Sequence, residues 1–149
     1  MMTQPIWFKP IDLAALKRLH VDTMDGHLGV EITDFGPDWL AGRMPVGPRT
    51  LQPMGILHGG ASAVLAETLG SVAASEVVNP DEFFCVGQEI NANHLRSVRG
   101  GHVHGVARPF HLGRTSHVWG IELRNDAGQM TCVARLTMAV RRKARAPEE

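Results

Sequence analysis

The stretch Gln52-Pro53-Met54-Gly55-Ile56-Leu57-His58-Gly59-Gly60, followed by the apolar run over 61–78, decides how the rest of the chain is interpreted. Proline and glycine keep its first half out of regular structure, and the second half predicts a helix over 60–78 that is apolar almost all round. Such a helix is expected to be buried. It contains one carboxylate, Glu67, and a charge in apolar surroundings is costly unless partners or a function retain it.

Small residues share the face of Glu67 on a helical wheel, namely Ala63, Gly70, Ser71 and Ala74. The larger apolar side chains of the same helix fall on another face. We therefore expect Glu67 to lie where a neighbouring element can approach closely. A glutamate exposed to solvent or paired with an arginine remains the alternative.

The other segments alternate between helix and strand signals. Asp12 can cap a short helix that ends near Gly26, and strand patterns from Leu28 and over 39–46 predict a hairpin. Asn79-Pro80-Asp81 ends the long helix, and four further strands are expected over 85–96, 102–110, 116–124 and 130–141. This order indicates an α+β domain in which one antiparallel sheet curls around one helix.

Length and composition limit the possibilities further. The 149 residues, 44% of them hydrophobic, fit one domain over 1–149, with 1–10 and 142–149 expected to be loosely ordered. Fifteen basic and fifteen acidic residues balance, which argues against nucleic acid or an anionic membrane as partner. Cys85 and Cys132 lack metal-site spacing, and no leader or membrane-spanning run occurs, so a cytoplasmic setting is expected.

The run over 51–71, LQPMGILHGGASAVLAETLGS, resembles the signature of hotdog-fold acyl-CoA thioesterases. It is most similar to the branch of 1,4-dihydroxy-2-naphthoyl-CoA hydrolase and the enterobactin-pathway proofreading thioesterase. Matches over 87–96 and 111–114 extend the resemblance across most of the chain after Gly26. It implies a long helix wrapped by a sheet, and a homodimer or a tetramer of two dimers, with active sites at the dimer interface.

The resemblance also implies roles for four catalytic residues. Glu67 is expected to attack the thioester carbonyl or to activate water, and both roles stay open. Free N–H groups at a helix start suit developing negative charge, and the resemblance gives that role to the Gly59 amide. His58 is expected to orient the thioester or to help the thiolate leave, with a structural histidine as the alternative. Gln52 is expected to position the attacking water or the substrate carbonyl, and both residues are expected to come from the other subunit.

Cationic side chains and turn amides suit the phosphates of coenzyme A. The resemblance implies a substrate-binding set made of Gly60, Ser71, His94, Arg96, His111, Gly113, Arg114 and Ser116. Ser71 is equally compatible with a packing role. His102 and His104 share one face of a strand, but no carboxylate or cysteine stands at ligand spacing, so no metal and no cofactor are expected.

These observations predict a cytoplasmic thioesterase that hydrolyses an acyl-CoA, with an aromatic acyl group favoured by the branch. One alternative is a proofreading hydrolase that acts on acyl groups held by a carrier protein. A second alternative is an acyl-CoA-binding protein without activity, and a hydratase is disfavoured because its aspartate and histidine arrangement is not found.

Overall fold

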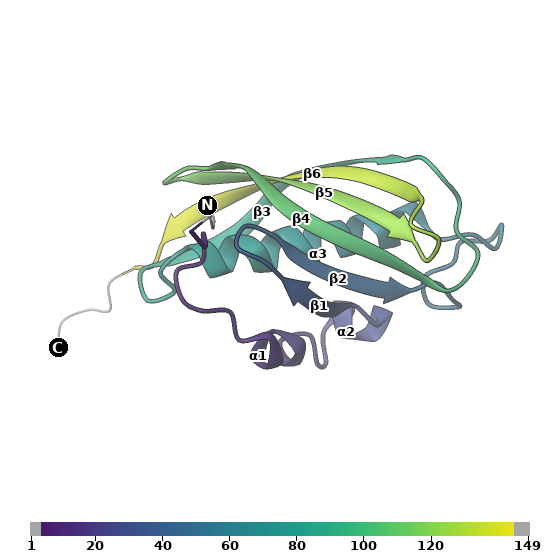
Figure 1. Cartoon of the computed structure of the whole chain (residues 1–149), viewed down its shortest axis with the longest axis horizontal. Helices are drawn as coiled ribbons and strands as arrows, with labels where there is room; N and C mark the ends of the chain where they lie inside the picture. The colour runs from purple at the N-terminus through teal and green to yellow at the C-terminus, as the bar shows by residue number, and fades with distance from the viewer. Residues whose placement is uncertain (1–3, 145–149) are drawn as a thin grey trace.

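The computed structural model describes residues 4–144 and shows one sheet wrapped around one long helix, as predicted (Figure 1). The elements, in chain order, are α1 (Leu13–Arg18), α2 (Met24–Leu28), β1 (Glu31–Phe35), β2 (Leu40–Pro45), α3 (Gly59–Val77), β3 (Phe83–His94), β4 (His102–Leu112), β5 (Ser116–Asn125) and β6 (Met130–Arg142). The six strands pair antiparallel in the order β1-β2-β4-β5-β6-β3.

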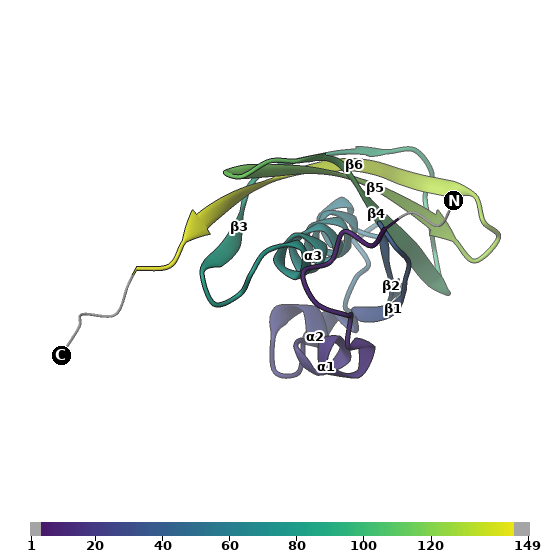
Figure 2. The same ribbon diagram turned by 60° about the vertical axis from the view of Figure 1, so that its left-hand side comes forward.

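Helix α3 lies along the concave side of the sheet, and Figure 2 shows it close to end-on beneath the curved strands. Its sheet-facing side chains, with Leu65 and Leu69 fully buried, meet the inward residues of the central strands, such as Trp119 and Leu136. Close approach depends on glycine at two strand positions. A Cβ at Gly105 would lie 2.5 Å from Leu69 Cδ1, and one at Gly42 would lie 2.7 Å from Leu69 Cδ2.

The first part of the chain differs from the prediction in two respects. The first helix, expected to end near Gly26, ends at Arg18. The residues expected to begin a strand at Leu28 form the end of a second short helix, α2. Thr23 caps its start by accepting from the Gly26 N–H, and Gly29 ends it with a left-handed backbone, φ 79°. Strand β1 therefore starts three residues later, at Glu31.

Helices α1 and α2 lie on the side of α3 that faces away from the sheet (Figure 2). They are fastened by a polar contact, because Thr68 Oγ1 donates to Asp25 Oδ1 over 2.9 Å. The other oxygen of Asp25 lies 3.2 Å from Nδ1 of the buried His20. This network fixes α2 against the middle of α3, whereas α1 packs mainly against β1.

The segment before α1 is better held than its composition suggests. Ile6 N donates to Pro37 O, Phe8 N donates to Glu76 O, and Trp7 Nε1 donates to Gly36 O. Within the stretch 1–10, expected to be loosely ordered, residues 6–8 are thus hydrogen-bonded to the rest of the chain, and residues 1–3 lie outside the described part. At the other end β6 continues to Arg142, and the expected loose residues 145–149 lie outside the described part of the chain.

No helix in residues 4–144 combines the length and the apolar character needed to cross a membrane.

Candidate active site

The start of α3 is capped by the side chain of the residue before it. His58 has extended backbone angles, and its Nδ1 accepts from the Gly60 N–H over 2.8 Å. Capping requires an unprotonated Nδ1, so the ring proton sits on Nε2 and can donate outward. Within residues 4–144 the Gly59 N–H has no acceptor, which leaves it free at the positive end of the helix dipole.

The loop before α3 has a defined conformation. His58 N donates to Thr50 O over 2.8 Å, Leu57 N donates to Val98 O over 2.7 Å, and Gly55 adopts a positive φ of 72°. Gln52 Oε1 accepts from the Met54 N–H, which leaves the Gln52 amide nitrogen as a donor. The loop is therefore preorganised, and it presents polar side chains at the end of the helix.

A pocket of about 350 Å³ opens at this end of α3. Polar side chains line this polar pocket together with a larger apolar surface, and the lining consists of Gln52, Ile56, Leu57, Gly59, Ser62, His94, Leu95, Arg96, Ser97 and Thr131. The ring of His94 approaches Gly59 so closely that a Cβ there would lie 2.8 Å from His94 Nε2. The structure thus brings together five predicted residues, Gln52, Gly59, His94 and Arg96 in the lining and His58 at the cap.

Glu67 lies in the middle of α3 and is half-buried. Its carboxylate approaches the bulge in β3, where a Cβ at Gly87 would lie 2.5 Å from Glu67 Oε1. Within residues 4–144 it forms no ion pair, and the side-chain hydrogen bonds of α3 involve Thr68, Ser71 and Ser75 instead. The arginine-paired alternative is therefore not found in this part of the chain.

The face around Glu67 is less buried than expected. Ala63 and Ser71 are half-exposed beside it, whereas Gly70 and Ala74 are buried. A Cβ on Gly70 would lie 2.6 Å from Leu136 Cδ2, so this residue faces the sheet. The helix was predicted to be buried on all sides, but within one chain it has one open face.

Ser71 does not contact the carboxylate one turn before it. Its hydroxyl lies 3.6 Å from Met138 Sδ, and its carbonyl accepts from Ser75 Oγ. Both contacts fit the packing alternative. Glu67 and Gly59 are also separated, because eight residues of α-helix span about 12 Å.

The remaining predicted substrate-binding residues lie elsewhere. Gly113 and Arg114 lie in the turn between β4 and β5, His111 lies near the end of β4, and Ser116 begins β5. Ser116 pairs with Ala139 near the end of β6, whereas His94 pairs with Cys132 near its start. Seven strand residues correspond to about 23 Å, so one chain does not bring the two groups into a single site.

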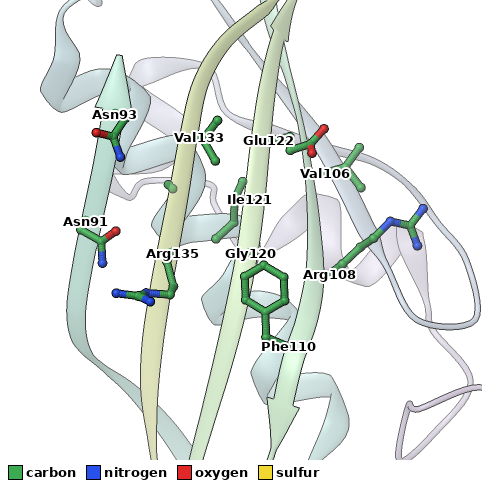
Figure 3. Close-up of a pocket in the computed structure, with 11 residues that line it drawn as sticks. Asn91, Asn93, Val106, Arg108, Phe110, Gly120, Ile121, Glu122, Val133 and Arg135 are labelled. Carbon is green, nitrogen blue, oxygen red and sulfur yellow. The ribbon is translucent and has the colours of Figure 1, made fainter. Parts of the chain in front are cut away.

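Another pocket lies on the outer face of the sheet and contains none of the predicted residues (Figure 3). It has a volume of about 420 Å³, and the exposed ring of Phe110 covers Gly120 there. Arg108 of β4 and Arg135 of β6 point outward at its sides, from the two strands that flank β5. It is separated from Glu67 by the sheet itself.

Asp126 was not anticipated near the two strand histidines. The hairpin between β5 and β6 brings its carboxylate 2.7 Å from His104 Nε2, and His102 N donates to it. The hydrogen bond from His104 lowers the pKa of Asp126. Residues 4–144 nevertheless contain no group of three or more ligands placed to hold a metal ion.

Comparison of the sequence with models of known protein families identifies the family of this chain. The family model described as Thioesterase superfamily matches residues 54–132, which include the open face of α3 and most of the polar pocket. This chain belongs to the Thioesterase superfamily. It is a thioester hydrolase with the hotdog fold, and the predicted family, fold and class of enzyme are confirmed.

Relatives of this thioesterase match along nearly the whole chain. The 1,4-dihydroxy-2-naphthoyl-CoA hydrolase of Escherichia coli is 47% identical over 91% of this chain and 98% of its own length. The proofreading thioesterase EntH of Cronobacter turicensis is 48% identical over the same shares. The crystal structure of a glutamine-to-alanine variant of thioesterase PA1618 from Pseudomonas aeruginosa has a TM-score of 0.92 and 48% identity, covering 93% of this chain and 99% of that one.

Two residues of functional interest in this thioesterase were missed from the sequence. Gly87 leaves the space that the Glu67 carboxylate occupies, since a Cβ there would collide with it. Its place in the matched motif over 87–96 was the only signal for it in the sequence. His117 is 2% exposed and lines a separate pocket at the far end of α3. A histidine at an inward position of an alternating strand is the signal that could have found it.

Proposed function

We propose that this thioesterase hydrolyses an acyl-CoA in a site that two copies of the chain build together, with Glu67 as its essential carboxylate. The observation that carries the proposal is the unpaired, half-buried Glu67 on the open face of α3. A carboxylate in this setting has no structural partner within residues 4–144. A bound substrate and a second chain can supply the contacts that the Glu67 carboxylate lacks within one chain.

Distances within one chain support the proposal that the remaining catalytic groups come from a partner chain. A carbonyl polarised by the Gly59 N–H is about 12 Å along the helix from Glu67 of the same chain, too far for both to act on one thioester. Gly59 must therefore act together with Gln52 and His58 of the same loop. Their target is the thioester that faces the Glu67 carboxylate of the other copy.

Strand β3 offers the surface for such pairing. It has twelve residues, bonds only to β6 among the described strands, and leaves its other edge open with Phe84 and Val86 exposed. Antiparallel addition of a second β3 satisfies this edge under two-fold symmetry. It also sets the two α3 helices antiparallel, so that the start of one approaches the middle of the other.

The same symmetry supports one coenzyme site. It would bring His94 and Arg96 of one copy toward the β4–β5 turn of the other, where Arg114 lies. The two groups, separated by about 23 Å within a chain, would then face the same phosphates. We propose a dimer as the minimal active unit, and pairing of dimers into a tetramer remains part of the hypothesis.

The chemistry follows from these positions. The Gly59 N–H and the helix dipole stabilise the oxyanion that forms on the thioester carbonyl. In one route Glu67 attacks the carbonyl carbon, the C–S bond breaks to release the coenzyme A thiolate, and water then cleaves the resulting anhydride to the free acid and the Glu67 carboxylate. In the other route Glu67 removes a proton from the attacking water, and the tetrahedral intermediate then expels the thiolate. In either route the thiolate takes up a proton, for which the Nε2–H of His58 is the proposed donor.

The substrate class rests on the relatives. The hydrolase of Escherichia coli is named for an aromatic acyl-CoA, which supports an aromatic acyl group here. The name of EntH supports the proofreading alternative, in which a carrier protein holds the acyl group. A comparison of kcat/KM for matched aryl-CoA and aryl-carrier thioesters separates them. Unpaired Cys85 and Cys132 fit a reducing cytoplasm as the proposed location.

Subunit mixing tests the shared site. Glu67→Ala and Gln52→Ala homodimers are each expected to be nearly inactive. After unfolding and refolding together, half of the dimers carry both variants and own one intact site, so about a quarter of wild-type activity should return. No recovery despite proven mixed dimers would place all catalytic groups in one chain and overturn the proposal.

A further inference from the structure

The pocket on the outer face of the sheet owes its shape to a missing side chain and to a bulge (Figure 3). Gly120 of β5 is paired with Arg108 of β4 on one side and with Arg135 of β6 on the other. Phe110 is the extra residue of a bulge in β4, since the pairing of β4 with β5 skips it. Its ring lies over Gly120, where a Cβ would collide with it. The bulge thus aims an aromatic ring at an outward position of β5 that has no side chain.

The Phe110 ring has one face against Gly120 and is otherwise open to a ligand. Phe110 is 73% exposed, and Val133 is the other exposed large apolar residue of the lining. Polar side chains lie around these two residues, namely Asn91, Asn93, Arg108, Glu122 and Arg135. Two apolar side chains form a small patch for a subunit interface, whereas a volume of about 420 Å³ suits a small organic molecule. Because aromatic rings gain from stacking on each other, the exposed ring favours an aromatic ligand.

The charges in the lining favour an anion. Arg108 is bound to Asp38 over 3.0 Å, and Glu122 is bound to Arg124 over 3.0 Å. Arg135, by contrast, forms no ion pair within residues 4–144. In this part of the chain it is therefore the charge of the lining that lacks an opposite partner.

A carboxylate is the anion that matches Arg135, because a guanidinium can donate two parallel hydrogen bonds to it. Figure 3 shows Arg135 extending from β6 toward β3, where its paired residue is Asn91. The negative charge nearby on β3 is Glu89, which is not part of the lining and already accepts from Asn91 over 3.0 Å. Asn93, two positions along β3, adds an amide donor to the same side of the pocket.

We propose that this pocket binds an aromatic carboxylate, with its ring stacked on Phe110 and its carboxylate held by Arg135. The sheet separates the pocket from Glu67, so a molecule bound here is not placed for hydrolysis. The site goes beyond the proposed function and does not depend on it.

Three small probes separate the two contacts. Benzoate carries both the ring and the charge, benzyl alcohol lacks the charge, and cyclohexanecarboxylate lacks the aromatic ring. Each is titrated into the intact protein, and the amide chemical shifts of Gly120, Glu122, Val133 and Arg135 give a local readout. We expect benzoate to bind about fivefold more tightly than benzyl alcohol, the size of an exposed ion pair. We expect it to bind about threefold more tightly than cyclohexanecarboxylate, because only benzoate can stack.

Two variants assign these preferences to residues. Arg135→Gln should remove the preference for benzoate over benzyl alcohol. Phe110→Leu should remove the preference for benzoate over cyclohexanecarboxylate. Arg141→Gln removes another exposed arginine of β6, outside the pocket, and is the matched control that should keep both preferences. All three side chains are exposed, so the variants should keep the fold, which their remaining amide shifts report.

Three results would overturn the proposal: equal affinity for benzoate and benzyl alcohol, a preference that persists in its matching variant, or no saturable shift at the four amides. The last result is expected if a second copy of the chain covers this face. Sedimentation would then show a smaller assembly for Phe110→Ser than for wild type. An absence of thioester hydrolysis would refute the proposed function alone, because binding on the outer face is read from local shifts.

Discussion

The two faces of α3 are built from similar residues, but one face packs against the sheet and the other carries the candidate catalytic carboxylate. The sheet-facing side buries Leu65, Ala66, Leu69 and Ala73 completely. The open side, with Ala63, Glu67 and Ser71, is only half-covered within one chain. Successive residues of a helix are rotated by about 100°, so residues that stabilise the core and the candidate catalytic carboxylate lie on different faces of the same helix.

The difference teaches that an apolar helix need not be buried on every side by its own chain. The sheet covers one face and the two short helices cover part of the other through the Thr68–Asp25 contact. What remains open is the strip that carries Glu67 toward β3. Variants on the two faces should therefore fail in different ways.

The largest effect is expected on the sheet side. Leu69→Ala removes a side chain that is 0% exposed and leaves a cavity against Gly42 and Gly105, which should lower the free energy of unfolding by about 2–5 kcal/mol. Denaturant titration measures it. Val72→Ala, on the half-exposed side, is the matched control, and an equal loss there would remove the distinction between the faces.

The open side should respond in rate and not in stability. Glu67→Ala should lower kcat by at least about 100-fold, as expected for loss of a nucleophile or base, with little change in Tm. Steady-state kinetics on an aryl-CoA and thermal unfolding give both quantities. Glu76→Ala removes another carboxylate of the same helix. A comparable loss of kcat in this variant would show that the loss of any negative charge on α3, and not the position of Glu67, lowers the rate.

Glycine at the helix–sheet contact provides a third test. Gly105→Ala adds a Cβ that would lie 2.5 Å from Leu69 Cδ1 and 2.8 Å from Leu123 Cδ2, so we expect a loss of about 1–3 kcal/mol. Gly128→Ala is not a suitable control because its φ is 75°. Gly100→Ala, with open space around it, should change stability much less.

The smallest effect concerns pH. The folded chain lowers the pKa of His117 from about 6.5, so below that pH the unfolded chain binds more protons. Stability from this group is therefore complete above pH 6.5, falls on acidification, and stops falling below the folded pKa. Tm measured at pH 7.5 and 5.5 should drop more in wild type than in His117→Phe; an identical drop would contradict this.

The fold was largely predictable because its signals are local. The long helix begins and ends within one residue of the prediction, since glycines and Asn79-Pro80 punctuate it, and β6 follows the predicted alternation. Helix α2 was missed because five residues show little periodicity. Thr23 as a cap and Gly29 as a stop were the available signals.

The candidate site was predictable in its residues but not in its arrangement. His94 and His111 are close in sequence, yet they lie at opposite ends of the sheet because His94 ends β3, whereas His111 comes after β4 has run back along the length of the sheet. Strand order is a property of the whole chain that local patterns do not contain. For the same reason, Asp126 beside His104 and the cavity around His117 were not foreseen.

The pairing of β3 with β6 also affects the order in which the protein can fold during synthesis. Each residue of β3 waits for a partner that is translated more than thirty residues later, after β4 and β5 have formed their own hairpin. Until then only part of the sheet can cover α3, and both edges of β3 lack a hydrogen-bonded partner strand. The strand that we propose as the dimer interface therefore leaves the ribosome with both edges unpaired, and slower translation of β4 to β6 is expected to prolong its exposure to aggregation.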